Sequence, residues 1–224
     1  MTGQLVFEFG HRPALGRDDF IVAPGNAVAV DWLDRWPAWP SAGIVLHGPG
    51  GSGKTHLGQV FRQRSGAVAI AAGDLATESL PALLGGARYA FVDDAEAAPE
   101  EPLFHLHNLI AEQGGHLLLT AALPPAHWRL RLADLRSRLV VFPAVALALP
   151  DDDLLGAVLF KLFSDRQLKV KPDLIAFLVA HMERSLGAAR ELVAALDAAA
   201  LAAGRGITIP LARRLLETPA SLPD

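Results

Sequence analysis

A glycine-rich segment at residues 48–55, GPGGSGKT, has the residue types and spacing of a phosphate-binding P-loop. Its glycines allow successive backbone N–H groups to surround an anion, and the helix that follows directs its N-terminal partial positive charge at the same phosphates. We expect Lys54 to reach the β- and γ-phosphates and the Thr55 hydroxyl to coordinate Mg²⁺. The alternative is a glycine-rich turn beside an accidental Lys-Thr pair. The residues predicted to hold the nucleotide are Gly48, Gly51, Ser52, Gly53, Lys54, Thr55 and His56.

A second apolar run, residues 89–92, ends in two acidic residues, Asp93 and Asp94. A P-loop needs a carboxylate on a neighbouring strand to organise Mg²⁺, so we assign this role to Asp93 and expect Asp94 to polarise the attacking water. A third run ends at Thr120, whose hydroxyl is expected beside the γ-phosphate. The alternative for Asp93 and Asp94 is an acidic turn after a buried strand, and the alternative for Thr120 is a purely structural role.

The elements that must position these residues alternate along the chain. Short apolar runs predict strands near 43–48, 67–71, 88–93, 116–121 and 139–147, with helical or looped stretches between them. Strands separated by helices predict an α/β fold with a parallel sheet covered on both faces. After Pro150 the pattern changes to apolar residues at helical spacing, which predicts an all-helical region. We therefore expect an N-terminal arm at 1–12, a P-loop domain at 13–149 and a small helical domain at 150–224.

Composition excludes several classes of protein. The 224 residues are 51% hydrophobic and 20% charged, which excludes wholesale disorder. No cysteine is present, which excludes disulfides and thiolate metal sites. A formal charge of -4 argues against a dedicated DNA-binding protein, and no apolar run is long enough for a membrane helix, so we expect a soluble, cytosolic protein. We interpret His105 and His107 as buried or capping residues rather than metal ligands.

Several motifs resemble, in chain order, those of the DnaA clade of AAA+ proteins. They are GKTHL at 53–57, the Asp93-Asp94 pair, LRSRL at 135–139 and GAAREL at 187–192. The likeness covers nearly the whole chain and implies a P-loop AAA+ sheet followed by a helical lid.

The resemblance also implies roles for two arginines. The arginine of the Ser-Arg motif, here Arg138, would be the finger that reaches a neighbouring subunit's nucleotide, and the lid arginine, here Arg190, would be sensor 2. A planar guanidinium suits the spread charge of a γ-phosphate. The alternatives are a solvated basic stretch for Arg138 and a surface salt bridge for Arg190. The segment from residue 18 to 26 resembles the part of these proteins that closes over the base, so Ile21 and Val22 are expected to contact adenine.

The N-terminal residues 4–9, QLVFEF, resemble the sliding-clamp-binding peptide of DnaA paralogues that lack the DNA-reading domain. Gln4, Leu5, Phe7 and Phe9 would place apolar anchors into a groove on the clamp. The alternative is an edge strand that packs on the body of the protein. The sequence ends at Asp224, shortly after the expected lid, and we interpret it as lacking a helix-turn-helix domain.

The resemblance implies a regulator that binds ADP or ATP with Mg²⁺, docks on the sliding clamp and promotes hydrolysis of ATP held by DnaA. We expect no sequence-specific DNA binding, and a homo-oligomer is left open. DnaA proteins usually follow the threonine of the third motif with Ser-Asp, whereas this chain has Ala121 and Ala122, so intrinsic hydrolysis is expected to be weak or absent. The alternatives are a self-sufficient P-loop ATPase and an adaptor that resembles helicase loaders.

Overall fold

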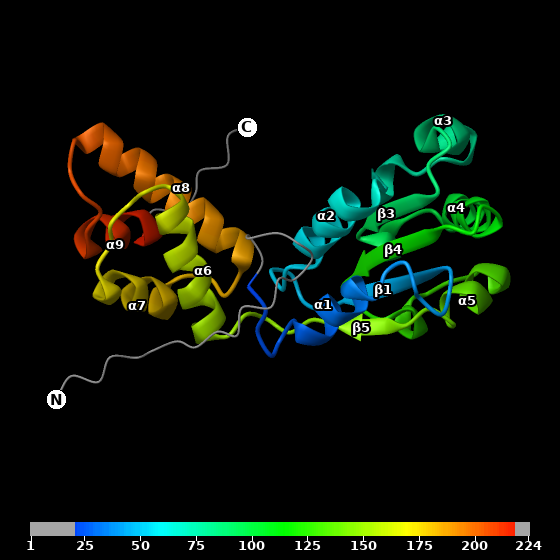
Figure 1. The fold of residues 1–224 in the computed structure, drawn as a ribbon, viewed down its shortest axis with the longest axis horizontal. Coiled ribbons are helices and arrows are strands. Elements are labelled where there is room, and N and C mark those ends of the chain that lie inside the picture. The colour runs from blue at the N-terminus through cyan, green and yellow to red at the C-terminus, as the bar shows by residue number, and fades with distance from the viewer. Residues whose placement is uncertain (1–20, 218–224) are drawn as a thin grey trace.

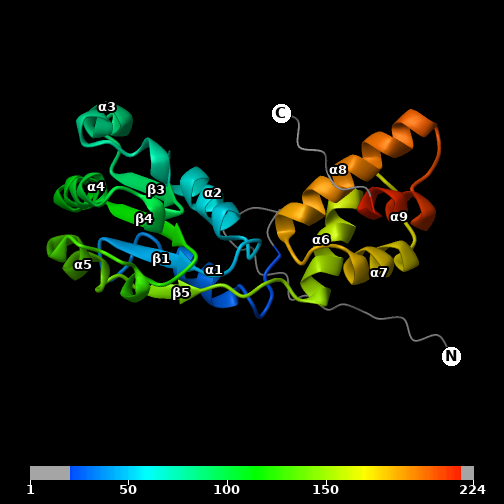
Figure 2. The same cartoon turned by 180° about the vertical axis from the view of Figure 1, so that it is seen from behind.

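A parallel sheet with helices on both faces and a cluster of four helices lie side by side along the long axis of the molecule (Figure 1). The structure is a computed structural model, and it describes residues 21–217. The P-loop belongs to the part of the molecule built on the sheet, and the four-helix cluster follows that part in the chain. The same two parts are visible from behind, where the end of α2 nearest the four helices approaches α8 (Figure 2).

The sheet has the strand order β2-β3-β4-β1-β5, and all its neighbouring strands are parallel. This confirms the predicted α/β fold with a parallel sheet. The central strand β1 precedes the P-loop and lies between β4 and β5, so chemistry at the ends of β1, β3 and β4 is gathered at one edge. The strands are β1 (Gly43–His47), β2 (Val68–Ala71), β3 (Tyr89–Asp93), β4 (His116–Ala121) and β5 (Ala144–Ala146).

The central strands are buried on both faces, because their alternate side chains enter two different hydrophobic clusters. In β3, Phe91 packs with helices α1 and α2, whereas Ala90 and Val92 pack with α3, α4 and α5. Gly58 of α2 lies so close to the Phe91 ring that a Cβ there would be 2.1 Å from it, so a glycine is required for this approach. The helices of this part are α1 (Ala27–Asp34), α2 (Lys54–Ser65), α3 (Leu80–Leu84), α4 (Glu100–Glu112) and α5 (Ala133–Leu139).

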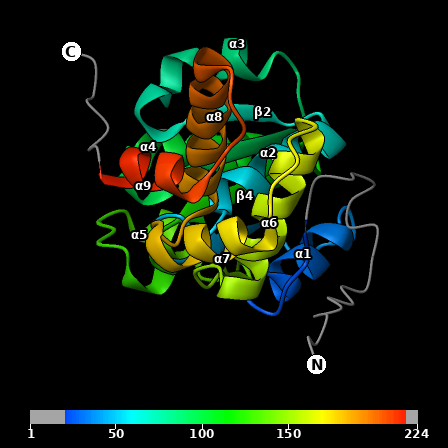
Figure 3. The ribbon, with the colours of Figure 1, turned by 90° about the vertical axis from the view of Figure 1, so that its left-hand side faces the viewer.

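Four further helices enclose a third hydrophobic cluster of their own. Asp151 caps the helix that begins at Asp152, since its carboxylate accepts a hydrogen bond from the Leu154 N–H at 2.8 Å. Ser185 caps the helix that begins at Leu186. Seen along the long axis, α7, α8 and α9 lie in front of the sheet (Figure 3). These helices are α6 (Asp152–Asp165), α7 (Pro172–His181), α8 (Leu186–Ala203) and α9 (Ile209–Glu217).

The predicted strand at 139–147 is wrong in its extent, because β5 covers only Ala144–Ala146. Leu139 is instead the last residue of α5, where it is buried together with Leu135. These two leucines are four residues apart and therefore share one face of a helix. Pro143, which lacks an N–H group, directly precedes the strand.

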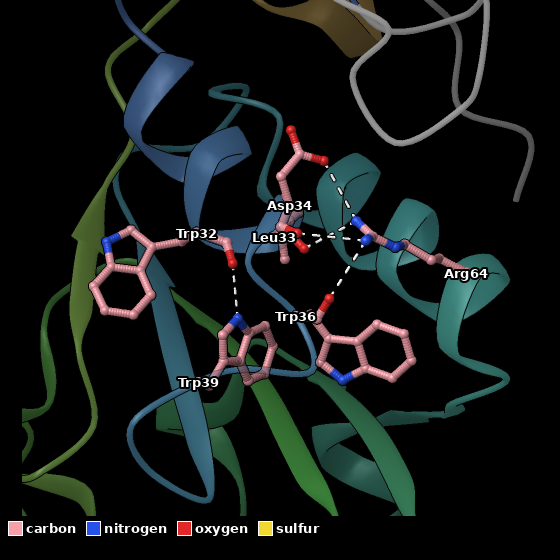
Figure 4. Close-up of polar contacts among 6 residues, drawn as sticks. All are labelled: Trp32, Leu33, Asp34, Trp36, Trp39 and Arg64. Carbon is pink, nitrogen blue, oxygen red and sulfur yellow. Dashed lines mark hydrogen bonds and ion pairs between the residues drawn. The ribbon is translucent and has the colours of Figure 1, made fainter.

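Arg64 of α2 holds the C-terminal end of α1 (Figure 4). Its guanidinium donates to the carbonyl of Leu33 at 3.1 Å, the carboxylate of Asp34 at 3.3 Å and the carbonyl of Trp36 at 3.3 Å. A cation at this end of a helix is favourable because the unpaired carbonyls there carry partial negative charge. Trp39 is buried beside it and donates its Nε1–H to the Trp32 carbonyl at 2.7 Å. Helix α1 is thereby fixed on α2, the helix that begins at the P-loop.

Candidate nucleotide-binding site

The P-loop connects the end of β1 to the start of α2. Its glycines at 48, 51 and 53 have φ values of 153°, 78° and 98°, which L side chains rarely adopt. Gly53 is the residue before α2, so the loop ends where the helix offers its unpaired N–H groups. No acidic residue lies in the first turn of α2. No carboxylate within this turn opposes the partial positive charge at the start of α2, which favours a bound anion.

Lys54 and Ser52 are buried within this loop. Lys54 is 9% exposed, and its ammonium donates to the carbonyls of Gly48 at 2.8 Å and Pro49 at 2.9 Å. Ser52 is 4% exposed, and its buried hydroxyl has no hydrogen-bond partner among the described residues. A buried polar atom without a partner is costly unless a ligand satisfies it. The unpartnered hydroxyl, the buried ammonium and the left-handed glycines all fit a bound phosphate group.

The hydroxyls of Thr55 and Thr120 meet the carboxylate of Asp93. Thr55 Oγ1 donates to Asp93 Oδ1 at 3.2 Å, and Thr120 Oγ1 donates to the same oxygen. Thr55 and Asp93 offer hard oxygen ligands of the kind that Mg²⁺ prefers, so the predicted metal pair is brought together. Thr120 is completely buried and also accepts the backbone N–H of Asp94 at 3.0 Å. Its hydroxyl therefore orients the acidic pair, and contact with a γ-phosphate stays a prediction.

Asp94 has an unusual backbone conformation, with a φ of 52° in the left-handed region. Burial raises the pKa of its carboxyl above the usual value, the charges of Asp93 and Glu96 raise it further, and Lys54 opposes them. A carboxyl with a raised pKa and an uncommon backbone conformation beside a P-loop is suited to proton chemistry. The role of Asp94 in polarising water stays a prediction.

A cavity of about 350 Å³ lies between α2, α6 and α8. At its wall, the Arg190 guanidinium lies 2.9 Å from Nδ1 of His56, which joins residues 134 positions apart in the chain. A guanidinium can only donate, so Nδ1 of His56 is the acceptor in this contact. The lining residues are Ile21, His56, Leu154, Val158, Lys161, Leu162, Asp165, Leu186 and Arg190.

Of the two residues expected at the base, Ile21 lines this cavity, whereas Val22 packs against the cluster between α1, α2 and the sheet. Sequence reasoning gave no role to the side chain of Asn26, which is 5% exposed and fixes this segment. Its Oδ1 accepts the Ala23 N–H at 2.9 Å, and its Nδ2 donates to the Ile21 carbonyl at 3.0 Å. An asparagine directly before a helix is a common turn signal, and this signal was available in the sequence.

The start of α8 rests on the P-loop, a contact that the sequence did not predict. The N–H of Leu186 donates to the Gly51 carbonyl at 3.4 Å, and a Cβ on Gly51 would lie 2.8 Å from that of Ser185. Ser185 is also the N-cap of α8, with its hydroxyl accepting the Ala188 N–H. The phosphate-binding loop and the four-helix cluster therefore share a direct contact.

Arg138 lies in a different environment from Arg190. It is exposed near the end of α5, and its guanidinium makes no hydrogen bond or ion pair with any of residues 21–217. Helix α5 lies at the end of the sheet farthest from the four-helix cluster (Figure 1). Val140 and Val141, which are 65% and 64% exposed, follow directly. The structure thus places Arg138 away from its own P-loop, on a surface with exposed apolar side chains.

The remaining predictions concern the N-terminal segment and the histidines of α4. Gln4, Leu5, Phe7 and Phe9 lie outside the described residues. His107 is buried in α4 against Phe142, and no group of three or more metal-ligating side chains occurs within residues 21–217. Within the same range, no helix has the length and apolarity needed to cross a bilayer.

The parallel sheet, the P-loop and the four-helix cluster together make up the fold of AAA+ P-loop proteins, which two solved structures share. Domain III of the replication initiator DnaA from Thermotoga maritima superposes with a TM-score of 0.73 over 89% of this chain and 93% of that one, at 18% identity. DnaA from Aquifex aeolicus, solved with AMPPCP bound, superposes with a TM-score of 0.66 over 85% of this chain and 66% of that one, at 18% identity.

Sequence comparison gives two further similarities. Residues 152–216 match the family model of the Hda lid domain. DnaA from Sphingopyxis alaskensis is 30% identical over 217 residues, which cover 84% of this chain and 47% of the relative. The chain is therefore similar to a DnaA protein over most of its length and to the Hda lid domain in its C-terminal helices, in agreement with the resemblance of its motifs. It spans about a third to a half of the length of the curated relatives that it matches.

Proposed function

We propose that this chain is a regulator of replication initiation that binds an adenine nucleotide and promotes hydrolysis of ATP held by DnaA. The observation that carries the proposal is the exposure of Arg138, which has no bonding partner among residues 21–217 and lies far from its own P-loop. A finger supplied to a neighbouring site raises hydrolysis by roughly 10³ to 10⁵ in known systems. The exposed Val140 and Val141 beside it support a protein contact at this surface.

The nucleotide is assigned to the P-loop and the adjoining cavity. Lys54 and the P-loop N–H groups would hold the phosphates, Thr55 and Asp93 would hold Mg²⁺, and the cavity lined by Ile21 would hold the base. When bound, Mg²⁺ neutralises charge on the phosphate oxygens. Binding of AMPPCP by the Aquifex aeolicus relative supports an adenine nucleotide here. Ala121 and Ala122 follow Thr120 where DnaA proteins usually have Ser-Asp, so this site lacks those polar side chains. We therefore expect it to hold its nucleotide with little turnover.

Docking on the sliding clamp through Gln4, Leu5, Phe7 and Phe9 belongs to the same proposal and rests on the sequence alone. The apolar anchors at alternate positions suit an extended peptide in a groove. Deleting residues 1–9 is expected to abolish clamp binding in surface plasmon resonance while ADP affinity stays within about twofold. Equal clamp binding by the truncated and full chains would exclude this role for the segment.

Arg138→Ala tests the central claim. This variant should bind ADP like the wild type but lose most of its stimulation of ATP hydrolysis by DnaA on clamp-loaded DNA, measured as DnaA-bound ATP converted to ADP over time. Arg138→Lys should rescue poorly, because an ammonium keeps the charge and loses the planar fork. Arg129→Ala is the matched control, since Arg129 is also an exposed arginine of the same basic stretch. Full stimulation by Arg138→Ala would contradict the proposal and direct attention to Arg136.

A self-sufficient ATPase is a second candidate, favoured by the raised pKa and strained backbone of Asp94. It predicts turnover by the isolated protein without DnaA or clamp, abolished by Asp94→Asn. The regulator predicts almost no such turnover. Steady-state phosphate release from the purified chain separates the two.

A further inference from the structure

Helix α5, which carries Arg138, has few stabilising contacts of its own. It has seven residues, of which only Leu135 and Leu139 are buried. Its N-cap residue is Leu132, which offers no side-chain acceptor to the unpaired N–H groups of the first turn. A helix this short does not hold its shape in water without outside contacts.

A carboxylate from another helix instead binds the two backbone N–H groups that lead into α5. Glu100, the first residue of α4, accepts the Arg131 N–H on both of its oxygens at 3.0 Å and the Leu132 N–H on Oε2 at 2.6 Å. These hydrogen bonds lower the pKa of the Glu100 carboxyl, so it is ionised at neutral pH. A second tie exists within the same segment, where Arg136 donates to the Leu130 carbonyl. Glu100 thus fixes the point at which α5 begins.

We propose that Glu100 is a positioning residue for Arg138: by binding the N–H groups of Arg131 and Leu132, it sets the start and direction of α5 and so the place at which the guanidinium is presented. This inference rests on the proposed role of Arg138 as a finger. Arg138 is on the last turn of α5, and α5 packs on α4, the helix that begins with Glu100, through the hydrophobic cluster that both helices enter. A displacement of about 1 Å at a catalytic group can reduce a rate by about a hundredfold.

The experiment compares three variants of the full chain by their stimulation of DnaA-bound ATP hydrolysis. Glu100→Ala is expected to reduce stimulation by about tenfold to a hundredfold while ADP affinity stays within about twofold. Glu100→Gln should stay within about threefold of the wild type, because one amide oxygen in the place of Oε2 can still accept both N–H groups. Glu101→Ala is the matched control, since Glu101 is exposed in the same helical turn and makes no hydrogen bond or ion pair within residues 21–217.

A double variant separates positioning from general stabilisation. In an Arg138→Ala background, Glu100→Ala should cause no further loss of stimulation, because it acts through the arginine. Loss by Arg138→Ala but not by Glu100→Ala would overturn this inference and leave the proposed function standing. An equal loss in Glu100→Gln and Glu100→Ala would also overturn it. No loss by Arg138→Ala would instead defeat the proposed function itself. Should Glu100→Ala fail to fold, Glu100→Asp, which withdraws the same charge by one methylene, replaces it with the same expected loss.

Discussion

The two ends of the sheet hold their charged side chains in opposite ways. At the P-loop, Lys54 and Asp93 are engaged by neighbouring backbone and hydroxyl groups before any ligand is considered. At the far end, Arg138 is exposed and unbonded among the described residues, although the helix that carries it is tied down by Glu100. The P-loop therefore keeps its charged groups bonded within the fold, whereas α5 presents an arginine outward, as the proposed roles of these two regions require.

The largest effect that would sharpen this comparison is expected at Lys54. Lys54→Ala removes a buried, hydrogen-bonded charge, and we expect a loss of about 2 to 5 kcal/mol in nucleotide binding, which calorimetry with ADP measures. The fold should persist, because within residues 21–217 the Lys54 ammonium donates hydrogen bonds to the loop carbonyls of Gly48 and Pro49 and to no side chain of the core. Unchanged ADP affinity would contradict the P-loop assignment.

A smaller effect is expected at Thr120. Thr120→Val keeps the shape of the side chain but removes its hydroxyl. The Asp93 carboxylate and the Asp94 N–H then each lose their hydrogen bond to this hydroxyl. Unfolding in urea should show a loss of about 1 to 3 kcal/mol, because the site is fully buried. The dependence of nucleotide affinity on Mg²⁺ should weaken as well. Thr120→Ser restores the hydroxyl and serves as the control, and stability equal to wild type in the valine variant would refute the positioning of Asp93 by this residue.

The lid arginine is expected to give a more modest change. Arg190→Ala removes one charged donor at the wall of the cavity, and we expect ATP affinity to fall by about tenfold, the range for a hydrogen bond to a charged group. ADP affinity should fall less, because the sensor 2 role concerns the γ-phosphate. Arg166→Ala, which removes an exposed arginine of the lid that pairs with Asp197, is the control. Equal losses of affinity for ATP and ADP would show that Arg190 lines the cavity without contacting the γ-phosphate.

The smallest expected effect is a shift along the pH axis. Asp94 must be deprotonated to polarise water, and its raised pKa means that deprotonation is completed at a higher pH than for an ordinary aspartate. Any intrinsic hydrolysis should therefore decline, as the pH falls, earlier than it would with an unperturbed carboxyl. Asp94→Asn should remove this acid limb together with the turnover. An acid limb that survives in Asp94→Asn would assign it to another group.

The sequence predicted the parallel sheet, the P-loop and the helical lid because each depends on local signals: glycine spacing, apolar runs and N-caps. It gave the wrong extent for the last strand, since Leu139 is apolar in either a helix or a strand and only its packing beside Leu135 decides. The contacts of Glu100 with Arg131 and of Arg190 with His56 could not be predicted, because 31 and 134 residues separate the partners. Such pairs are set by how helices pack rather than by any local pattern.

The contact between the start of α8 and Gly51 gives this long helix the geometry of a lever. Its 18 residues extend about 27 Å from the P-loop. A tilt of about 10° at this contact would therefore carry the far end of the helix through roughly 5 Å. Leu201, which is 83% exposed, lies near that far end. A small rotation at the loop would thus become a movement on the scale of a side chain at a distant surface.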